Sequence, residues 1–429
     1  MTPLAAHAAI RFGLGNRPEA QLPADPRAWL TGQISPLPEA PGPSLAEAFA
    51  AQRQRQRDPT SQAVSDLFRT EALAWSTRMI TTTAPFAERW ANFWTNHLTT
   101  SRRAGQATVM LGHYQRLAIR AHAFGRFEDM LLAAYRHPAM LFYLDQSGSI
   151  GPSSPAGQRA RRGLNENLAR ECMELHTVTP AAGYSQEDVT TLARLLTGWS
   201  VGRGAPANEP EGFLFRARAH EPGDKILLGR TFPEGEEGGA EALRFLAGHP
   251  ATHHALALKL ARHFVADAPP APAVARIEAA LRDSGGDLAA AARAVVAAPE
   301  ARAPLRKLRS GQDYAIAVLR ALGLGDEGAP MLLGTLARLN QPLWTAPAPI
   351  GWSDEASEWA APEQLMRRLD WASEIAGRTA AAGVIEPEPL GEVLLGPLAR
   401  AETMAAARRA GSVREGLLLL LASPEAQRR

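Results

Sequence analysis

The segment 165–177 concentrates side chains that could do chemistry, because its sequence NENLARECMELHT holds three carboxylates and an arginine. On an α-helix, with about 100° between successive residues, its polar side chains share one face and most of its apolar side chains another. The polar face comprises Glu166, Asn167, Arg170, Glu171, Glu174 and Thr177. Neighbouring carboxylates can act as general acid and base or bind a divalent cation. We therefore expect a catalytic or metal site at Glu171 and Glu174, with Arg170 binding or orienting an anionic group.

The same helix also has a structural interpretation. Glu166, Arg170 and Glu174 follow one another at intervals of four residues, which is the spacing of a ladder of ion pairs on a solvated helix face. Each such pair stabilises an isolated helix by about 0.2–0.5 kcal/mol. The two interpretations differ in whether the polar face lines a cleft or meets bulk water, and the sequence leaves both open.

His176 is a further candidate at the end of this helix. It lies two residues after Glu174, and side chains at that spacing on a regular helix point about 160° apart. Both could bind one ion only if the helix ends between them. Pro180 favours an end nearby, because it disfavours the helical conformation at Thr179.

Two more histidines fall at positions where a functional role and a structural role are both open. His97 shares the apolar face of a helix expected at 85–98, so it is either a core histidine or a ligand or base that reaches out from a hydrophobic wall. His220 falls at a predicted turn, so it is either solvated or presented to a cleft by a loop. The predicted catalytic residues are Glu171, Glu174, Arg170 and His220. The predicted metal ligands are Glu171, Glu174, His176 and His97.

The common motifs of other chemistries do not occur. The sequence contains no Gly-rich phosphate loop, no Gly-x-Ser-x-Gly nucleophile elbow and no His-Glu-x-x-His zinc helix. The single cysteine, Cys172, excludes an intramolecular disulfide and a structural Cys-rich zinc site. Since Cys172 falls on the apolar face of the polar helix, we do not expect it to be a nucleophile.

The elements that must position these residues are mostly helices. Apolar residues recur at helical spacing along most of the chain after residue 44, and Ser44 with Glu47 forms the signature of a capping box. Alternating Phe213, Phe215 and Ala217, a Pro-Gly turn and the run KILLG predict one β-hairpin near 212–229. We therefore predict an all-α fold with this small hairpin and long irregular loops. The organisation expected is an irregular N-terminal segment, 1–45, followed by a single helical domain, 46–429.

Composition limits the classes of partner. The 429 residues carry a formal net charge of +2, so there is no general electrostatic case for binding nucleic acid. No run of about 18 apolar residues occurs, so a membrane-spanning helix is not expected. The first fifteen residues lack the pattern of a secretory signal, which predicts a cytoplasmic location.

Several blocks of the sequence resemble a known family. NENLARECMELHTVTPAAGYSQEDVTTLARLLTGW at 165–199 is similar to the signature of the bacterial domain-of-unknown-function family 1800. Further similar blocks are FWTNHL at 93–98, HPAMLFYLD at 137–145, FLFRARAHEPGDKILLG at 213–229, HPATHHALALKLARHFVAD at 249–267 and LWTAPAPIGW at 343–352. The resemblance implies a protein of uncharacterised function. It also implies an extracytoplasmic location, because members are often exported, and a partner related to sulfatases and alkaline phosphatases, which is often encoded nearby.

Two functions follow as expectations. The first is a metal-assisted or carboxylate-based hydrolase or transferase that acts on an anionic or glycan-like substrate at the polar helix. The sequence does not identify a cofactor; in the metal-assisted alternative it would be a divalent metal. The second is a noncatalytic helical scaffold that binds the sulfatase-like partner.

Overall fold

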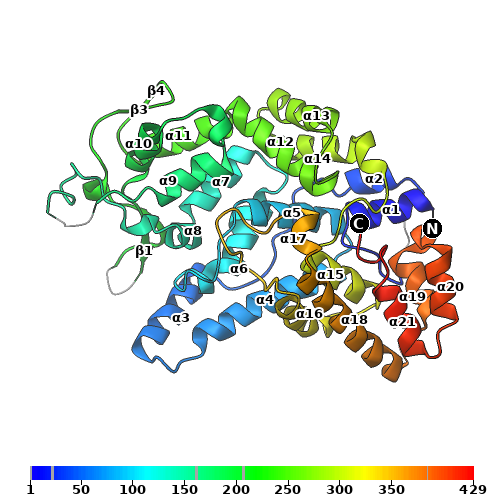
Figure 1. Ribbon diagram of the computed structural model, residues 1–429. Coiled ribbons are helices and arrows are strands. Elements are labelled where there is room, and N and C mark those ends of the chain that lie inside the picture. The colour runs from blue at the N-terminus through cyan, green and yellow to red at the C-terminus, as the bar shows by residue number, and fades with distance from the viewer. Residues whose placement is uncertain (1, 21–23, 160–162, 205–207, 384) are drawn as a thin grey trace.

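The computed structural model describes residues 2–20, 24–159, 163–204, 208–383 and 385–429. Helices dominate it, and the strands described form two small antiparallel sheets (Figure 1). The predicted fold class, predominantly α-helical with a small β-hairpin, is confirmed. The α-helices are α1 (Pro3–Arg11), α2 (Pro26–Thr31), α3 (Leu45–Arg57), α4 (Ala63–Thr81), α5 (Pro85–His97), α6 (Leu111–His113), α7 (Phe127–Arg136), α8 (Pro138–Tyr143), α9 (Asn167–Glu171), α10 (Gln186–Leu196), α11 (Glu236–Ala247), α12 (Pro250–Phe264), α13 (Ala271–Asp283), α14 (Leu288–Ala297), α15 (Gly311–Ala321), α16 (Gly328–Arg338), α17 (Ala356–Trp359), α18 (Pro362–Ala382), α19 (Pro387–Leu394), α20 (Ala401–Arg408) and α21 (Val413–Leu421).

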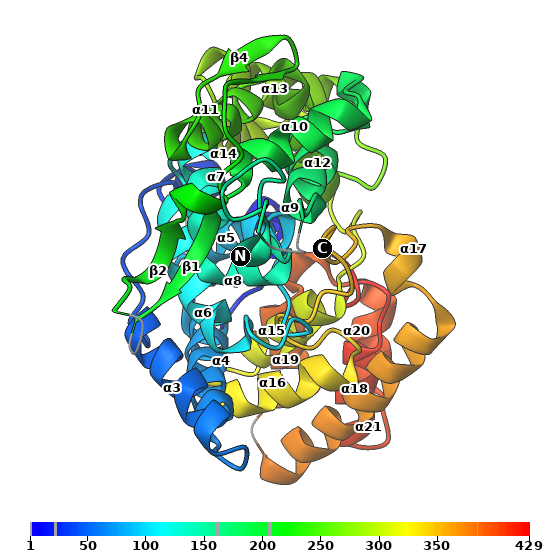
Figure 2. The same ribbon diagram turned by 90° about the vertical axis from the view of Figure 1, so that its left-hand side faces the viewer.

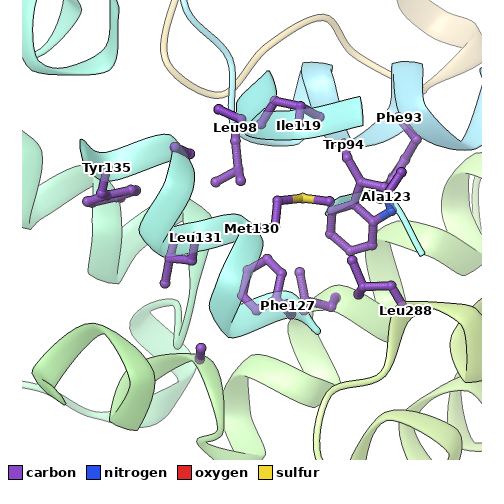
Figure 3. Close-up of a cluster of buried hydrophobic side chains, with 14 of the residues drawn as sticks. Phe93, Trp94, Leu98, Ile119, Ala123, Phe127, Met130, Leu131, Tyr135 and Leu288 are labelled. Atoms are coloured by element: carbon purple, nitrogen blue, oxygen red, sulfur yellow. The ribbon is translucent and has the colours of Figure 1, made fainter. Parts of the chain in front are cut away.

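The larger of two hydrophobic cores is built around α5 and α7. Side chains from α8 to α14 and from α1 join it. Trp94 of α5 and Phe127 of α7 pack with ring centroids 5.7 Å apart, and Met130 and Leu288 complete this part of the core (Figure 3). The aromatic residues of α5 are fully or almost fully buried because this helix is surrounded by others. We call this cluster the larger core.

The smaller core is formed by α4, α15, α16, α18, α19 and α21. Tyr314 of α15 and Trp371 of α18 meet edge to face within it, with ring centroids 5.4 Å apart. In Figure 2 these helices lie below the green helices of the larger core. Phe68 of α4 and Trp344 pack against both cores. The chain therefore holds two hydrophobic clusters whose junction is lined by side chains from both.

The N-terminal segment 1–45 is only partly irregular. It contains α1 and α2, and the residues of α1 from Ala5 to Arg11 are buried. Ala8, Phe12 and Leu30 belong to the larger core. Since its apolar side chains are built into that core, this segment is packed into the fold.

The strands near 212–229 pair differently from the single hairpin that the sequence suggested. β2 (Glu211–Phe215) pairs with β1 (Trp199–Arg203), and β3 (Lys225–Leu227) pairs with β4 (Arg230–Phe232). The reason is local: Leu228 and Gly229 both have positive φ, as a two-residue type I′ turn requires. The run KILLG is thus one short strand and its turn, and β2 turns back onto β1.

Candidate functional site

The polar helix is not a regular α-helix. It begins as α9 and continues as a π-helix over Cys172–His176. Beyond it, Thr179 has a φ of 59°, a conformation that is strained for a β-branched residue. π-Helical turns occur often at functional sites. Because a π-turn is wider than an α-turn, a layout at 100° per residue does not place the side chains after Cys172 correctly.

The predicted catalytic residues of this helix lie close together in the chain but have different surroundings. Arg170 pairs with Glu166 at 2.8 Å and also donates to Gln186. Glu174 is exposed and Glu171 is half-buried. Burial and the nearby charge of Glu174 raise the pKa of Glu171, although Arg170 acts in the opposite direction. The first ion pair of the predicted ladder, between Glu166 and Arg170, is thus present.

The two histidines predicted as metal ligands meet in the interior. His97 is 5% exposed and His176 is fully buried, and their ring centroids are 5.9 Å apart. Nε2 of His97 lies 3.1 Å from the carbonyl oxygen of His176, and Nδ1 of His176 lies 2.7 Å from the hydroxyl of Tyr135. Burial lowers the pKa of both, to about 3 for His176 and well below the ordinary value for His97. Both rings are therefore neutral at pH 7.

A metal centre finds no geometric support at these positions. Across the described ranges of the chain, no three His, Cys, Asp or Glu side chains are arranged to hold a metal ion. Structural and catalytic metal sites usually need three or more protein ligands. The predicted set of Glu171, Glu174, His176 and His97 joins the two histidines but does not gather four donors around one point.

His220 is buried, and its ring forms hydrogen bonds with backbone groups. It is 3% exposed, and its Nδ1 lies 2.8 Å from the carbonyl oxygen of Thr197. Since a carbonyl only accepts, Nδ1 carries the proton and Nε2 accepts from the backbone N–H of Gly235 at 3.0 Å. Lys225 also contacts Nε2, at 3.3 Å. His220 thus connects the end of α10, the start of β3 and the start of α11.

A cavity at the junction of the two cores brings together more functional groups from distant segments of the chain than the polar helix does. It has a volume of about 100 Å³ and is lined from both cores, by Leu14 and Trp75 on one side and Phe93 on the other. We call it the junction cavity. Ionisable side chains from five regions of the chain line it: Arg89, His263, Asp313, Asp354 and Arg429. Such a site, partly apolar with a few convergent polar groups, is the usual form of a binding or active site.

His263 and Asp354 form an imidazole–carboxylate pair in this cavity. Nδ1 of His263 lies 2.6 Å from Oδ1 of Asp354. Within the described part of the chain, the buried Nε2 of His263 has no hydrogen-bond partner. Burial lowers the pKa of His263 more than Asp354 raises it, so the ring is neutral at pH 7. Burial raises the pKa of Asp354, but its hydrogen bond and electrostatic interaction with His263 and the charges of Arg429 and Lys307 outweigh this, so the net shift is downward.

Two arginines and Asp313 give the cavity its second charged group. Nη1 of Arg89 and Nε of Arg429 lie 3.0 Å and 2.9 Å from the carboxylate of Asp313. Burial raises the pKa of Asp313, but the two guanidinium groups lower it more, so the carboxylate stays charged. This cluster alone carries a net positive charge, which the carboxylate of Asp354 on the same cavity wall balances.

A segment with three tryptophans forms one wall of the cavity, and we call it the aromatic segment. It contains Trp344, Trp352 and Trp359 and passes in front of α5 (Figure 1). The side-chain amide of Asn96 donates to the carbonyl of Trp352 at 2.9 Å and accepts from its N–H at 2.8 Å. Gly351 has a φ of 81°, and a Cβ there would lie 2.5 Å from the carbonyl of Asn96. Asn96 and Gly351 together hold this segment against α5.

Sequence reasoning missed His263, Asp354, Arg89, Asp313 and Arg429. The signals that could have drawn attention to them were weak. His263 stands in the quoted block 249–267, and Asp354 stands two residues after the block 343–352. The pairing itself joins positions 91 residues apart, and no local pattern encodes that contact.

The comparisons with known proteins agree with the sequence blocks. No helix of the described residues combines the length and the apolar character needed to cross a membrane. No curated protein and no solved structure matches the chain. A family model described as "Protein of unknown function (DUF1800)" matches residues 7–428. Since that match covers nearly the whole sequence, the chain belongs to the DUF1800 family.

Proposed function

We propose that the protein is a hydrolase or transferase that acts on a polar, anionic or glycan-like substrate in the junction cavity. The observation that carries this proposal is the His263–Asp354 pair, with 2.6 Å between Nδ1 and Oδ1 and an Nε2 free of partners among the described residues. This is the arrangement of a general base: a carboxylate holds the imidazole in one tautomer and leaves the other nitrogen to take a proton.

The chemistry follows from the tautomer. Asp354 accepts from Nδ1–H, so Nε2 holds a lone pair directed away from Asp354. Nε2 would remove a proton from a water molecule or a substrate hydroxyl, and the oxygen would then attack an electrophilic centre of the substrate. Asp354 would stabilise the imidazolium that forms. The proton would return from Nε2 to the leaving group.

The side chains of the cavity wall indicate the class of substrate. Arg89 and Arg429 place guanidinium groups at the cavity wall, although Asp313 and Asp354 balance their charge. Guanidinium groups are the side chains that bind anionic groups with two parallel hydrogen bonds. Trp344 and Trp352 are half-buried and line the same cavity, and an indole face binds the apolar face of a sugar ring. Asn92 and Gln312, also in the wall, offer amide donors and acceptors for hydroxyl groups.

The test uses an ester panel of 4-nitrophenyl acetate, phosphate and sulfate, extended with common 4-nitrophenyl glycosides. At least one should be turned over, and His263→Gln should lower kcat by about 10²–10⁴-fold, the range for a general base, without lowering the melting temperature greatly. His254→Gln is the matched control, because His254 lies on the same helix, is exposed and pairs with Glu278. Absence of turnover across the panel, or equal activity of the two variants, would contradict the proposal.

A noncatalytic binding role is the second candidate, and one surface favours it. Leu365, Met366 and Leu369 of α18 are 37%, 56% and 39% exposed, and α18 lies at the edge of the molecule (Figure 2). Exposed apolar side chains gathered on one helix are typical of a protein-binding surface. The partner would be the sulfatase-like protein that the family resemblance implies. Mixing the two purified proteins should give a complex on size-exclusion chromatography that Met366→Glu abolishes. Separate elution of the two wild-type proteins would exclude this candidate.

A further inference from the structure

A second cavity adjoins the junction cavity, shares Trp352 and Asp354 with it and contains an unusual lysine. It has a volume of about 210 Å³ and is lined by His97, Lys259, Arg262, Ile350, Trp352 and Glu355, among others. Ile350 is 61% exposed, so the cavity reaches the surface there. We call it the lysine cavity. The sequence holds only three lysines, Lys225, Lys259 and Lys307.

The contacts of Lys259 differ from those of an ordinary lysine. Its Nζ lies 2.7 Å from the carbonyl oxygen of Leu175 and 3.4 Å from Nδ1 of His97. Neither partner is a carboxylate, whereas Lys307 forms an ion pair with Asp267. Burial and the charge of Arg262 lower the pKa of Lys259 to about 8, although the more distant Asp354 acts in the opposite direction. An appreciable fraction of this amine is therefore neutral near pH 7.

The tautomer of His97 is fixed by its neighbour. Nε2 faces the carbonyl oxygen of His176 at 3.1 Å, and since a carbonyl only accepts, Nε2 carries the proton. Nδ1 is therefore the acceptor and faces Nζ of Lys259. The ring of His97 is held between Phe93 and Trp94, with centroids 6.3 Å and 5.6 Å away. A neutral base is thus held in a fixed orientation beside the amine.

We propose that Lys259 is a nucleophilic amine that binds a small aldehyde or ketone covalently, as an imine, in the lysine cavity. Ile350 and Trp352 form an apolar wall for the body of the carbonyl compound. This inference goes beyond the proposed function and does not depend on it, because His263 takes no part in it.

The step balances without any further reactant. The lone pair of Nζ attacks the carbonyl carbon, and one of the two Nζ protons passes by way of Nδ1 of His97 to the carbonyl oxygen, which gives a carbinolamine. His97 then accepts the second proton from Nζ at Nδ1 and passes it to the hydroxyl group, which leaves as water while the C=N bond forms. The products are one imine and one water molecule. The low pKa of His97 makes the transient imidazolium a good acid for this return.

The experiment is reductive labelling of the full chain with butanal and sodium cyanoborohydride at pH 7, followed by peptide mass spectrometry. The rarity of lysine makes the readout clean. The matched reference is the lysine introduced by Arg409→Lys, because position 409 is exposed. We expect the butyl adduct at Lys259 to form at least about tenfold faster than at the reference, since an ordinary exposed lysine is almost fully protonated at this pH. Lys225 and Lys307 should label more slowly still.

Two variants separate nucleophilicity from accessibility. Lys259→Arg keeps a cation beside Leu175 and should abolish the adduct at this position. His97→Gln keeps a donor for the carbonyl of His176 but removes the base, so the rate at Lys259 should fall several-fold. If His97→Gln does not fold, the comparison with the reference lysine still tests the proposal. Labelling of Lys259 at or below the rate of the reference lysine would overturn it.

Discussion

His263 and Asp354 are 91 residues apart in the sequence, yet Nδ1 of one lies 2.6 Å from Oδ1 of the other at the junction of the two cores. His263 lies on α12, in the larger core. Asp354 lies on the aromatic segment, which hydrogen bonds of Asn96 hold against α5. The pair therefore exists only when both the helix packing and the segment are in place. An active site made this way depends on the whole fold.

Asp354→Asn should test whether His263 needs the negative charge of Asp354 or only a neighbouring side chain of the same shape. An amide can still face Nδ1, but its NH2 group can donate to Nδ1 and so favour the wrong tautomer. The neutral amide also no longer stabilises the imidazolium. We expect kcat to fall by roughly 10²–10⁴-fold on any substrate identified in the ester panel. Steady-state kinetics at pH 7 measures this, with Asp326→Asn as a control away from the cavity. Equal kcat values for the two variants would remove Asp354 from the mechanism.

The pH dependence of turnover follows from the direction of the His263 shift. Its pKa is lowered from 6.5 because burial outweighs the effect of Asp354. The neutral, basic form therefore persists below pH 6.5. Activity should stay level from pH 8 to pH 6.5 and should decline only in more acidic solution, as Nε2 becomes protonated. A kcat profile that already falls between pH 8 and pH 7 would contradict this assignment.

Asn96→Ala should loosen the aromatic segment without unfolding the cores. The variant loses hydrogen bonds of 2.9 Å and 2.8 Å to the backbone of Trp352. Leaving these two backbone groups without their partner costs about 1–3 kcal/mol. We expect chymotrypsin to cleave after Trp352 faster than in the wild type, while Asn167→Ala, at an exposed position of α9, leaves the rate unchanged. Equal rates in all three proteins would show that the segment is held by other contacts.

Much of the helical architecture could be predicted from sequence, because helix starts and amphipathic faces are local. Ser44 with Glu47 forms the predicted capping box, and Ser185 with Asp188 forms a second one with the same local spacing. The pairing of the strands could not be predicted from residues 212–229, because β2 pairs with β1 and β3 pairs with β4, and both partners lie outside that segment.

The candidate site was harder to predict, for two physical reasons. The polar helix changes to a π-helix at Cys172, so regular α-helical geometry misplaced the side chains that follow. The junction cavity depends on contacts between distant segments, such as that of Arg89 with Asp313, 224 residues apart. His97 shows the limit clearly: its position on an apolar face was predicted, but its contact with Lys259 was not.

Glu71 and Arg116 form a buried ion pair that should matter for stability. Nη2 and Nε of Arg116 lie 2.8 Å and 3.1 Å from the two carboxylate oxygens of Glu71, and both side chains are almost fully buried. Removing one partner leaves an uncompensated buried charge, which costs about 3–5 kcal/mol. Urea denaturation should show this loss for Glu71→Ala. Glu128→Ala, at a more exposed pair with Arg126, should cost about 0–1 kcal/mol. Equal losses would mean that burial of the Glu71 pair does not govern its contribution.

Glu171 provides a test of what the polar helix does. Its pKa is raised by burial and by the charge of Glu174, so the folded state binds a proton more tightly than the unfolded chain does. Stability from this group is present below the unfolded pKa, near 4.5, and is lost as the pH rises through the folded pKa. At pH 7 the charged carboxylate therefore destabilises the fold.

Glu171→Gln should then raise the melting temperature at pH 7 and change it little at pH 4. Glu174→Gln should also raise it at pH 7, because it removes the neighbouring charge, and the two effects should not add fully because the groups interact. Differential scanning calorimetry at the two pH values measures this. A lower melting temperature for Glu174→Gln at pH 7 would instead show that Glu174 completes the stabilising ladder with Arg170. Destabilisation by Glu171→Gln at pH 7 would show that its carboxylate has a stabilising cationic partner.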